Sequence, residues 1–110
     1  MAKFREFLER DNYFAAQASI HSLVVSKRDG KIGITVPGIN KRIQKEDVKG
    51  FNIARRANWH WWYDLDLIYL DGGEEKTLPL GTVPGIKADS AMNWARKVND
   101  FYSGSNHPTS

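Results

Sequence analysis

The spacing of hydrophobic residues changes from helical to strand-like at about Ile20. Phe4, Phe7 and Leu8 are three and four positions apart, which predicts a short amphipathic N-terminal helix. The pattern resumes over residues 14–18, after an Asp11-Asn12 pair that is either a break or a new helix cap. Such a Phe-rich helix packs on its own sheet, on a partner subunit or on a membrane. We expect the first of these.

Alternating apolar and polar residues predict a mainly antiparallel sheet after this helix. The clearest strand runs from Trp59 to Leu70, where the odd positions are uniformly apolar and are expected to face the core. Asp29-Gly30, Pro37-Gly38 and Asp71-Gly72-Gly73 supply turns, and Pro79 indicates an edge or a strand end. The predicted strands cover residues 20–26, 31–36, 39–44, 48–57, 59–70 and 76–82.

A second helical pattern closes the chain. Asp89 or Ser90 is expected to cap it and Gly104 to stop it, with Ala91, Trp94 or Ala95, Val98, and Phe101 or Tyr102 on one face. The whole predicts one α+β domain over residues 1–104 and a disordered tail over 105–110. We expect a strongly bent antiparallel sheet, or a partly open barrel, of six to seven strands with a helix at each end of the sequence.

Composition narrows the chemistry. The 110 residues include no cysteine, which excludes disulfides, thiolate nucleophiles and cysteine-based metal sites. No apolar run approaches the roughly 20 residues that span a bilayer, and the first residues lack the apolar core of a signal peptide. The prediction is a cytoplasmic protein without a cofactor or metal.

Charge is unevenly distributed along the chain. Residues 41–56 contain six basic and two acidic side chains, whereas residues 64–75 contain five acidic and none basic. Neighbouring antiparallel strands with these charges are expected to pair across the sheet. The alternative is that the basic stretch meets a partner, for which nucleic acid or an anionic membrane surface would suit its charge. The basic residues of this stretch are Lys41, Arg42, Lys45, Lys49, Arg55 and Arg56.

Several hairpin strands followed by one C-terminal amphipathic helix with a central Trp94 resemble the pleckstrin-homology-like fold. The segment from Arg42 to Phe51 is similar to a stretch of bacterial members, in which a strand ends in a short acidic turn. The resemblance covers about Ile20 to Tyr102. It implies a bent, partly open barrel plugged by the last helix, and a binding function more than a catalytic one.

One strand face collects the residues that best suit catalysis. His60, Asp64 and Asp66 all occupy even positions, so they share a face and could bind a metal or act as an acid–base group. Cross-strand pairing with Arg55 or Arg56 is the interpretation we prefer for these carboxylates. Among the other residues, no serine, threonine or lysine has an identifiable activating partner. The sequence therefore predicts a protein that is not an enzyme.

The block from Trp59 to Tyr63 is the most unusual feature. Alternation places Trp62 on the polar face, where it either lies under the N-terminal helix or is an exposed anchor for a partner. Basic side chains beside aromatic ones suit single-stranded nucleic acid, but the nearby acids favour a protein partner. The predicted function is therefore a non-enzymatic interaction module, an adaptor or small inhibitor, that binds a protein. The predicted contact residues are Arg55, Arg56 and Trp62, with Arg42, Lys45 and Lys49 as a basic flank.

Overall fold

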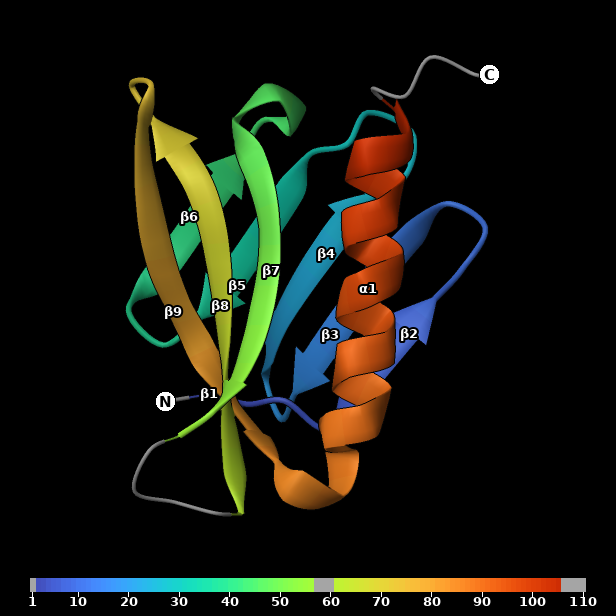
Figure 1. Cartoon of the computed structure of the whole chain (residues 1–110), viewed down its shortest axis with the longest axis vertical. Coiled ribbons are helices and arrows are strands. Elements are labelled where there is room, and N and C mark those ends of the chain that lie inside the picture. The colour runs from blue at the N-terminus through green and yellow to red at the C-terminus, as the bar shows by residue number, and fades with distance from the viewer. Residues whose placement is uncertain (1, 57–60, 106–110) are drawn as a thin grey trace.

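The structure is a computed structural model that describes residues 2–56 and 61–105. Within these residues, nine strands form two sheets and one helix follows them (Figure 1). The five-stranded sheet has the spatial order β2 (Glu6–Glu9), β3 (Tyr13–Ala18), β4 (His21–Ser26), β5 (Ile32–Val36) and β6 (Ile39–Ile43). The four-stranded sheet has the order β1 (Ala2–Lys3), β9 (Glu74–Pro84), β8 (Trp62–Asp71) and β7 (Val48–Arg55). Helix α1 spans Ala88–Ser105, and short 3-10 turns at Lys45–Asp47 and Gly85–Lys87 precede β7 and α1.

The α+β class is therefore confirmed, but its arrangement differs from the predicted barrel. Two separate sheets take the place of one continuous bent sheet, and the described residues form no closed barrel. The central hairpins follow the sequence pattern closely. Leu65, Leu67 and Tyr69 of β8 are buried, as their odd positions predict. The turn before β5 has Gly30 at a φ of +73°, which glycine adopts without steric cost.

The predicted N-terminal helix is wrong, because this segment forms β1 and β2. Strand β1 pairs in parallel with β9, Ala2 lying opposite Gly81, and β2 pairs with β3 in an antiparallel manner. The segment at 13–18, read as a continuing helix, is strand β3. A run as short as residues 4–8 has no unique period: Phe7 faces the core from a strand as readily as from a helix. Pairing with strands distant in sequence decides its conformation.

Gly81 makes the parallel pairing of β1 possible. A Cβ atom at this position would collide with the Ala2 carbonyl oxygen and would lie 2.9 Å from the Phe4 ring. The backbone N–H of Phe4 donates to the Thr82 oxygen at 2.8 Å, and the Phe4 side chain is fully buried. A side chain at position 81 would therefore push the N-terminus off the sheet.

Helix α1 begins at Ala88, just before the predicted caps, and continues past Gly104 to Ser105. The remaining residues of the predicted tail lie outside the described residues. The expected apolar face of the helix is confirmed, and its buried members are Ala91, Trp94, Ala95, Val98 and Tyr102.

The ring of Trp94 connects the two sheets. It lies 5.7 Å from Phe7 of β2 and 5.3 Å from Phe51 of β7, measured between ring centroids. Helix α1 thus covers the side of the molecule where β2 and β7 lie (Figure 1). The opposite side, where β6 and the outer part of β9 lie, is not covered by a helix in the described chain.

Candidate functional site

The predicted contact residues lie at the two ends of β7. Arg42, Lys45 and Lys49 lie at or near its start, whereas Arg55 and Arg56 lie at its finish, beside the first residue of β8. An eight-residue strand is roughly 25 Å long at about 3.3 Å per residue. The predicted flank is therefore not part of the same surface as Arg55, Arg56 and Trp62.

Arg55 and Arg56 are both engaged by β8. The Arg56 Nε atom lies 3.2 Å from the Asp64 Oδ1 atom, and its backbone N–H donates to the Trp62 oxygen at 3.1 Å. Arg55 donates from Nη2 to the Tyr63 hydroxyl at 3.3 Å, and its guanidinium lies 5.7 Å from the centre of that ring. The cross-strand pairing expected for this region is confirmed for Arg56 and Asp64. Both arginines remain available to solvent, since Arg55 is exposed and the Arg56 side chain is more than a third exposed.

Trp62 is half-buried, and the N-terminal strand covers it where a helix had been expected. The Lys3 Nζ atom lies 5.4 Å from the centre of the Trp62 ring. Lys3 lies opposite Thr82 of β9, and Trp62 lies opposite Pro84 of the same strand. The contact between Lys3 and Trp62 thus helps to keep β1 against the sheet.

Trp61 is the exposed aromatic side chain at this end, which contradicts its predicted place in the core. It is 77% exposed, because β8 begins only at Trp62 and the alternation of the strand does not extend to residue 61. The Gly85 N–H donates to the Trp61 oxygen at 2.6 Å, and the next residue, Ile86, is 87% exposed. The Pro84-Gly85 break was the only sequence signal that Ile86 leaves the sheet. Trp59 and His60 lie outside the described residues.

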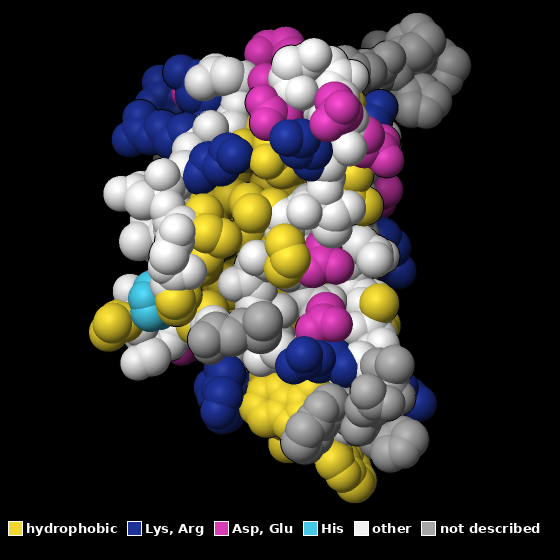
Figure 2. All heavy atoms as spheres, turned by 90° about the vertical axis from the view of Figure 1, so that its left-hand side faces the viewer, with side chains coloured by type: hydrophobic (Ala, Val, Ile, Leu, Met, Phe, Trp, Pro, Cys, Tyr) yellow, Lys and Arg dark blue, Asp and Glu magenta, His cyan; other side chains and the backbone are white. Residues whose placement is uncertain are grey.

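These side chains form what we call the end surface. Figure 2 shows hydrophobic and basic side chains together at this lower end of the molecule. Lys87, next to Ile86, is also exposed and adds a further positive charge to the group. The end surface comprises Arg55, Arg56, Trp61, Trp62, Ile86 and Lys87.

The predicted basic flank forms a separate group at the opposite end of β7. Arg42 is exposed on β6, opposite Gly33 of β5. The Lys45 side chain passes close over Gly30. A Cβ atom added to Gly30 would lie 2.6 Å from the Cγ atom of Lys45. Lys49 is exposed near the start of β7 and follows the acidic pair Glu46-Asp47. Acids are thus interspersed with these cations.

Asp64 and Asp66 lie on the outer face of β8. The pKa of Asp66 is raised from its ordinary value, first by partial burial and then by the negative charge of Asp64. Asp64 is engaged by Arg56, and His60 lies outside the described residues. Within residues 2–56 and 61–105, no group of three or more histidine, aspartate and glutamate side chains is placed to hold a metal ion.

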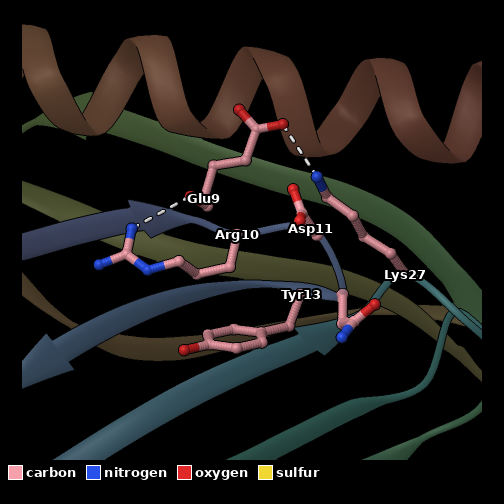
Figure 3. Close-up of a pocket in the computed structure, with 6 residues that line it drawn as sticks. Glu9, Arg10, Asp11, Tyr13 and Lys27 are labelled. Atoms are coloured by element: carbon pink, nitrogen blue, oxygen red, sulfur yellow. Dashed lines mark hydrogen bonds and ion pairs between the residues drawn. The ribbon is translucent and has the colours of Figure 1, made fainter.

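A polar hollow of about 550 Å³ lies beside the turn between β2 and β3 (Figure 3). The Glu9 carboxylate accepts a hydrogen bond from Lys27 at 3.0 Å and lies 3.5 Å from Lys97, and the bond from Lys27 is the main cause of its lowered pKa. Figure 3 shows the Arg10 guanidinium, which donates to the Glu9 backbone oxygen at 3.1 Å, and the Tyr13 ring, both apart from the Glu9 carboxylate and Lys27. Sequence reasoning gave no sign of this hollow, because Lys27 comes from the turn after β4, 18 residues from Glu9. Two of its charged lining residues, Glu9 and Lys27, are paired with each other.

A second hollow, of about 310 Å³ and mainly apolar, lies where the N-terminal segment meets two turns of the five-stranded sheet. It carries positive charge at its rim through Lys3 and Arg5. Its other lining residues are Ala2, Ala18, Ser19, His21 and Pro37.

Comparison of the chain with protein-family models, curated proteins and solved structures finds no match. Among the described residues, no helix is both long and apolar enough to cross a membrane.

Proposed function

We propose that this protein is a non-enzymatic interaction module that binds a protein partner through the end surface. The observation that carries the proposal is the adjacent exposure of Trp61 and Ile86, at 77% and 87%. Full burial of a large apolar side chain is worth about 1.5–3 kcal/mol. Covering both residues would thus supply a substantial part of a binding free energy.

The arginines of the end surface support a protein as the partner. Tryptophan and arginine are the residues most enriched among the hot spots of protein interfaces. Arg55 rests on Tyr63 and Arg56 is held by Asp64, so less side-chain entropy is lost when they bind. Asp64 and Asp66 on the adjoining face would repel the phosphates of a nucleic acid, which argues against that alternative.

The arrangement of the strands also supports an interaction function. One antiparallel meander from β2 to β6 and another from β7 to β9 precede α1. Strands in hairpin order before one C-terminal helix are the features on which the resemblance to the pleckstrin-homology-like fold rests, although two separate sheets take the place of the single bent sheet that it implies. The superfold hosts mostly binding functions, although fold alone identifies none of them.

The test is an affinity pull-down from nuclease-treated host lysate, followed by mass spectrometry. Wild-type protein is compared with Trp61→Ala and with the double variant Arg55→Ala/Arg56→Ala. We expect a stoichiometric protein that is retained by wild-type protein after nuclease treatment and lost from both variants. Recovery of nucleic acid alone, removed by nuclease, would replace the proposal with the nucleic-acid alternative.

Tyr13→Ala is the matched control. Tyr13 is an exposed aromatic residue on β3, outside the end surface, with 37% exposure. Its substitution should leave capture of the partner unchanged. Equal loss in Tyr13→Ala and Trp61→Ala would mean that the partner recognises exposed aromatic residues without regard to the end surface, and the proposal would fail.

A further inference from the structure

Helix α1 protects one edge strand of each sheet. The Trp94 Nε1 atom donates to the Leu8 oxygen of β2 at 3.1 Å, and the Asn99 side chain makes two hydrogen bonds with Phe51 of β7. The outermost strand of the five-stranded sheet on the other side is β6. It pairs with β5 alone within the described residues.

The free edge of β6 presents unpaired backbone groups. In an antiparallel pair, every second residue directs its N–H and C=O groups to the partner strand, so the residues between them direct theirs outward. An edge of this kind is a template for an additional strand, unless side chains oppose it. Strand β6 therefore offers hydrogen bonds to an extended segment of another molecule.

The side chains of β6 define which segment would fit. Arg42 is exposed, and Lys41 lies between the sheets with its Nζ atom 4.8 Å from the centre of the Tyr69 ring. Its ammonium group also donates to the Tyr69 hydroxyl at 3.1 Å. Two cations within five residues oppose pairing with a β6 strand of a second copy, because like charges would meet across the new ladder. They favour a strand that carries carboxylates.

Apolar surface is available beside this edge. Ile39 of β6 and Leu78 of β9 are only partly buried against the core. Figure 2 faces this side of the molecule and shows hydrophobic side chains gathered on it, with Lys and Arg side chains above them. The apolar hollow with Lys3 and Arg5 at its rim includes Pro37, two residues before β6 begins. Positive charge lies on the strand itself at Lys41 and Arg42 and just beyond its end at Lys45, which the acidic pair Glu46-Asp47 follows.

We propose that β6 accepts an extended acidic peptide segment as a sixth strand of this sheet. Its backbone would pair with the outward N–H and C=O groups, its carboxylates would meet Arg42 on one face of the strand, and its apolar side chains would face Ile39 and Leu78 on the other. Asp71 and Glu74 on the neighbouring hairpin are engaged by Lys76, at 3.3 and 3.9 Å. This surface is separate from the end surface, so the inference goes beyond the proposed function.

The probe is an acetylated, fluorescein-labelled peptide of about eight residues that alternates glutamate and valine, the length of an ordinary strand. Its binding is followed by fluorescence anisotropy at low salt. A second peptide has the same sequence with N-methyl groups on alternate backbone amides, which removes the hydrogen bonds of one edge and keeps the charges. A third peptide replaces every glutamate with lysine.

We expect saturable binding of the first peptide, with affinity reduced at least about tenfold by N-methylation and by Arg42→Glu. The matched control is Arg96→Glu, which makes the same charge change on the exposed face of α1 and should alter affinity less than about twofold. Because Arg42 is exposed, its variant should fold normally, which circular dichroism verifies. Trp61→Ala should bind the peptide as wild-type protein does, so this experiment is independent of the end surface.

Any of four results would overturn the inference. If wild-type protein does not bind the first peptide saturably, the acidic segment is excluded as a ligand. If the N-methylated peptide binds as tightly as the first peptide, strand addition is excluded. Equal loss in the Arg42 and Arg96 variants would mean that only net charge matters. Amide hydrogen exchange supplies the location, since slowed exchange should be confined to β6 and its neighbours. Protection on α1 alone would likewise contradict the inference.

Discussion

The side-chain amide of Asn99 forms two hydrogen bonds with the backbone of a single residue, Phe51. The Phe51 N–H donates to Oδ1 at 2.8 Å, and Nδ2 donates to the Phe51 oxygen at 3.0 Å. A helix side chain thereby takes the place that a neighbouring strand would have along β7. Gly50, at a φ of +151°, passes so close that a Cβ atom there would lie 2.9 Å from Oδ1 of Asn99.

We expect Asn99→Ala to destabilise the protein by about 1–3 kcal/mol, because both backbone groups of Phe51 would lose their partner in a part-buried position. Urea denaturation followed by circular dichroism measures the change. Asn93→Ala is the control on the same helix, since the Asn93 side chain is exposed and accepts a hydrogen bond from Arg96 of that helix. Equal effects of the two substitutions would contradict a structural role for the Asn99–Phe51 pair.

Trp94→Ala should destabilise the protein by roughly 3–5 kcal/mol, the usual cost of removing a large buried ring. Trp94 is 4% exposed and contacts Phe7 and Phe51 from the two sheets. Trp94→Phe should cost less, since it retains most of the ring and loses the hydrogen bond to Leu8. Thermal unfolding measures both variants. A melting temperature of Trp94→Ala close to that of wild-type protein would refute the register of α1.

The neighbouring residues Trp61 and Trp62 should respond differently to substitution. Trp61→Ala is expected to change the free energy of unfolding by less than about 0.5 kcal/mol, because the side chain is exposed. Trp62→Ala should cost about 1–2 kcal/mol, since its half-buried ring and its contact with Lys3 are lost, while the domain stays folded. Chemical denaturation of the two variants in parallel tests this. A larger loss of stability in Trp61→Ala than in Trp62→Ala would contradict the assignment of Trp61 as exposed and Trp62 as half-buried.

The Tyr102 hydroxyl should make the protein sensitive to alkali. It donates to the Gly30 oxygen at 2.8 Å, and burial is the main cause that raises its pKa strongly above the ordinary value of 10.0. The unfolded chain then releases a proton that the folded chain retains, so stability is present below pH 10 and falls as the pH rises above it. Denaturation midpoints between pH 8 and 11 measure the slope. Tyr102→Phe should flatten it, at a cost of about 1 kcal/mol near neutral pH.

Asp66→Asn should stabilise the protein at neutral pH. The pKa of Asp66 is raised above 3.8 by burial and by Asp64, so ionisation at neutral pH favours the unfolded chain. The penalty disappears as the pH falls through the raised pKa. We expect a gain below about 1 kcal/mol, because the carboxyl group is largely solvated. Urea midpoints at pH 7 and pH 3 test this, and a gain that persists at pH 3 would point to another cause.

Much of the fold could be predicted because it follows from local pattern. Alternation over β8 identifies Leu65 and Leu67 as core residues, and the spacing along α1 identifies Trp94 and Val98. Such patterns are informative when an element is long enough for its period to be distinct and one face is buried. The turn at Gly30 could be predicted for a different reason, since few residues other than glycine adopt a positive φ.

The candidate site was only partly predictable. Arg55 and Arg56 lie at the end surface beside Trp62, but the more exposed aromatic side chain is Trp61, one residue from the predicted contact residue Trp62. Alternation assigns faces only within a strand, and the residue at which β8 begins depends on its pairing with Pro84 of β9. Ile86 belongs to the surface because a backbone hydrogen bond joins Gly85 to Trp61, which no local pattern encodes.

The sequence by itself determined the helix face, the central hairpins and the concentration of aromatic and basic residues, since these depend on neighbours in the chain. Only the tertiary structure decided that the N-terminal segment is a strand, because Ala2 finds its partner at Gly81. It alone separated Arg42 from Arg55 along the length of β7, and it left β6 as an open edge. Each of these features is fixed by contacts between residues far apart in the sequence, whose free energy outweighs short-range preference.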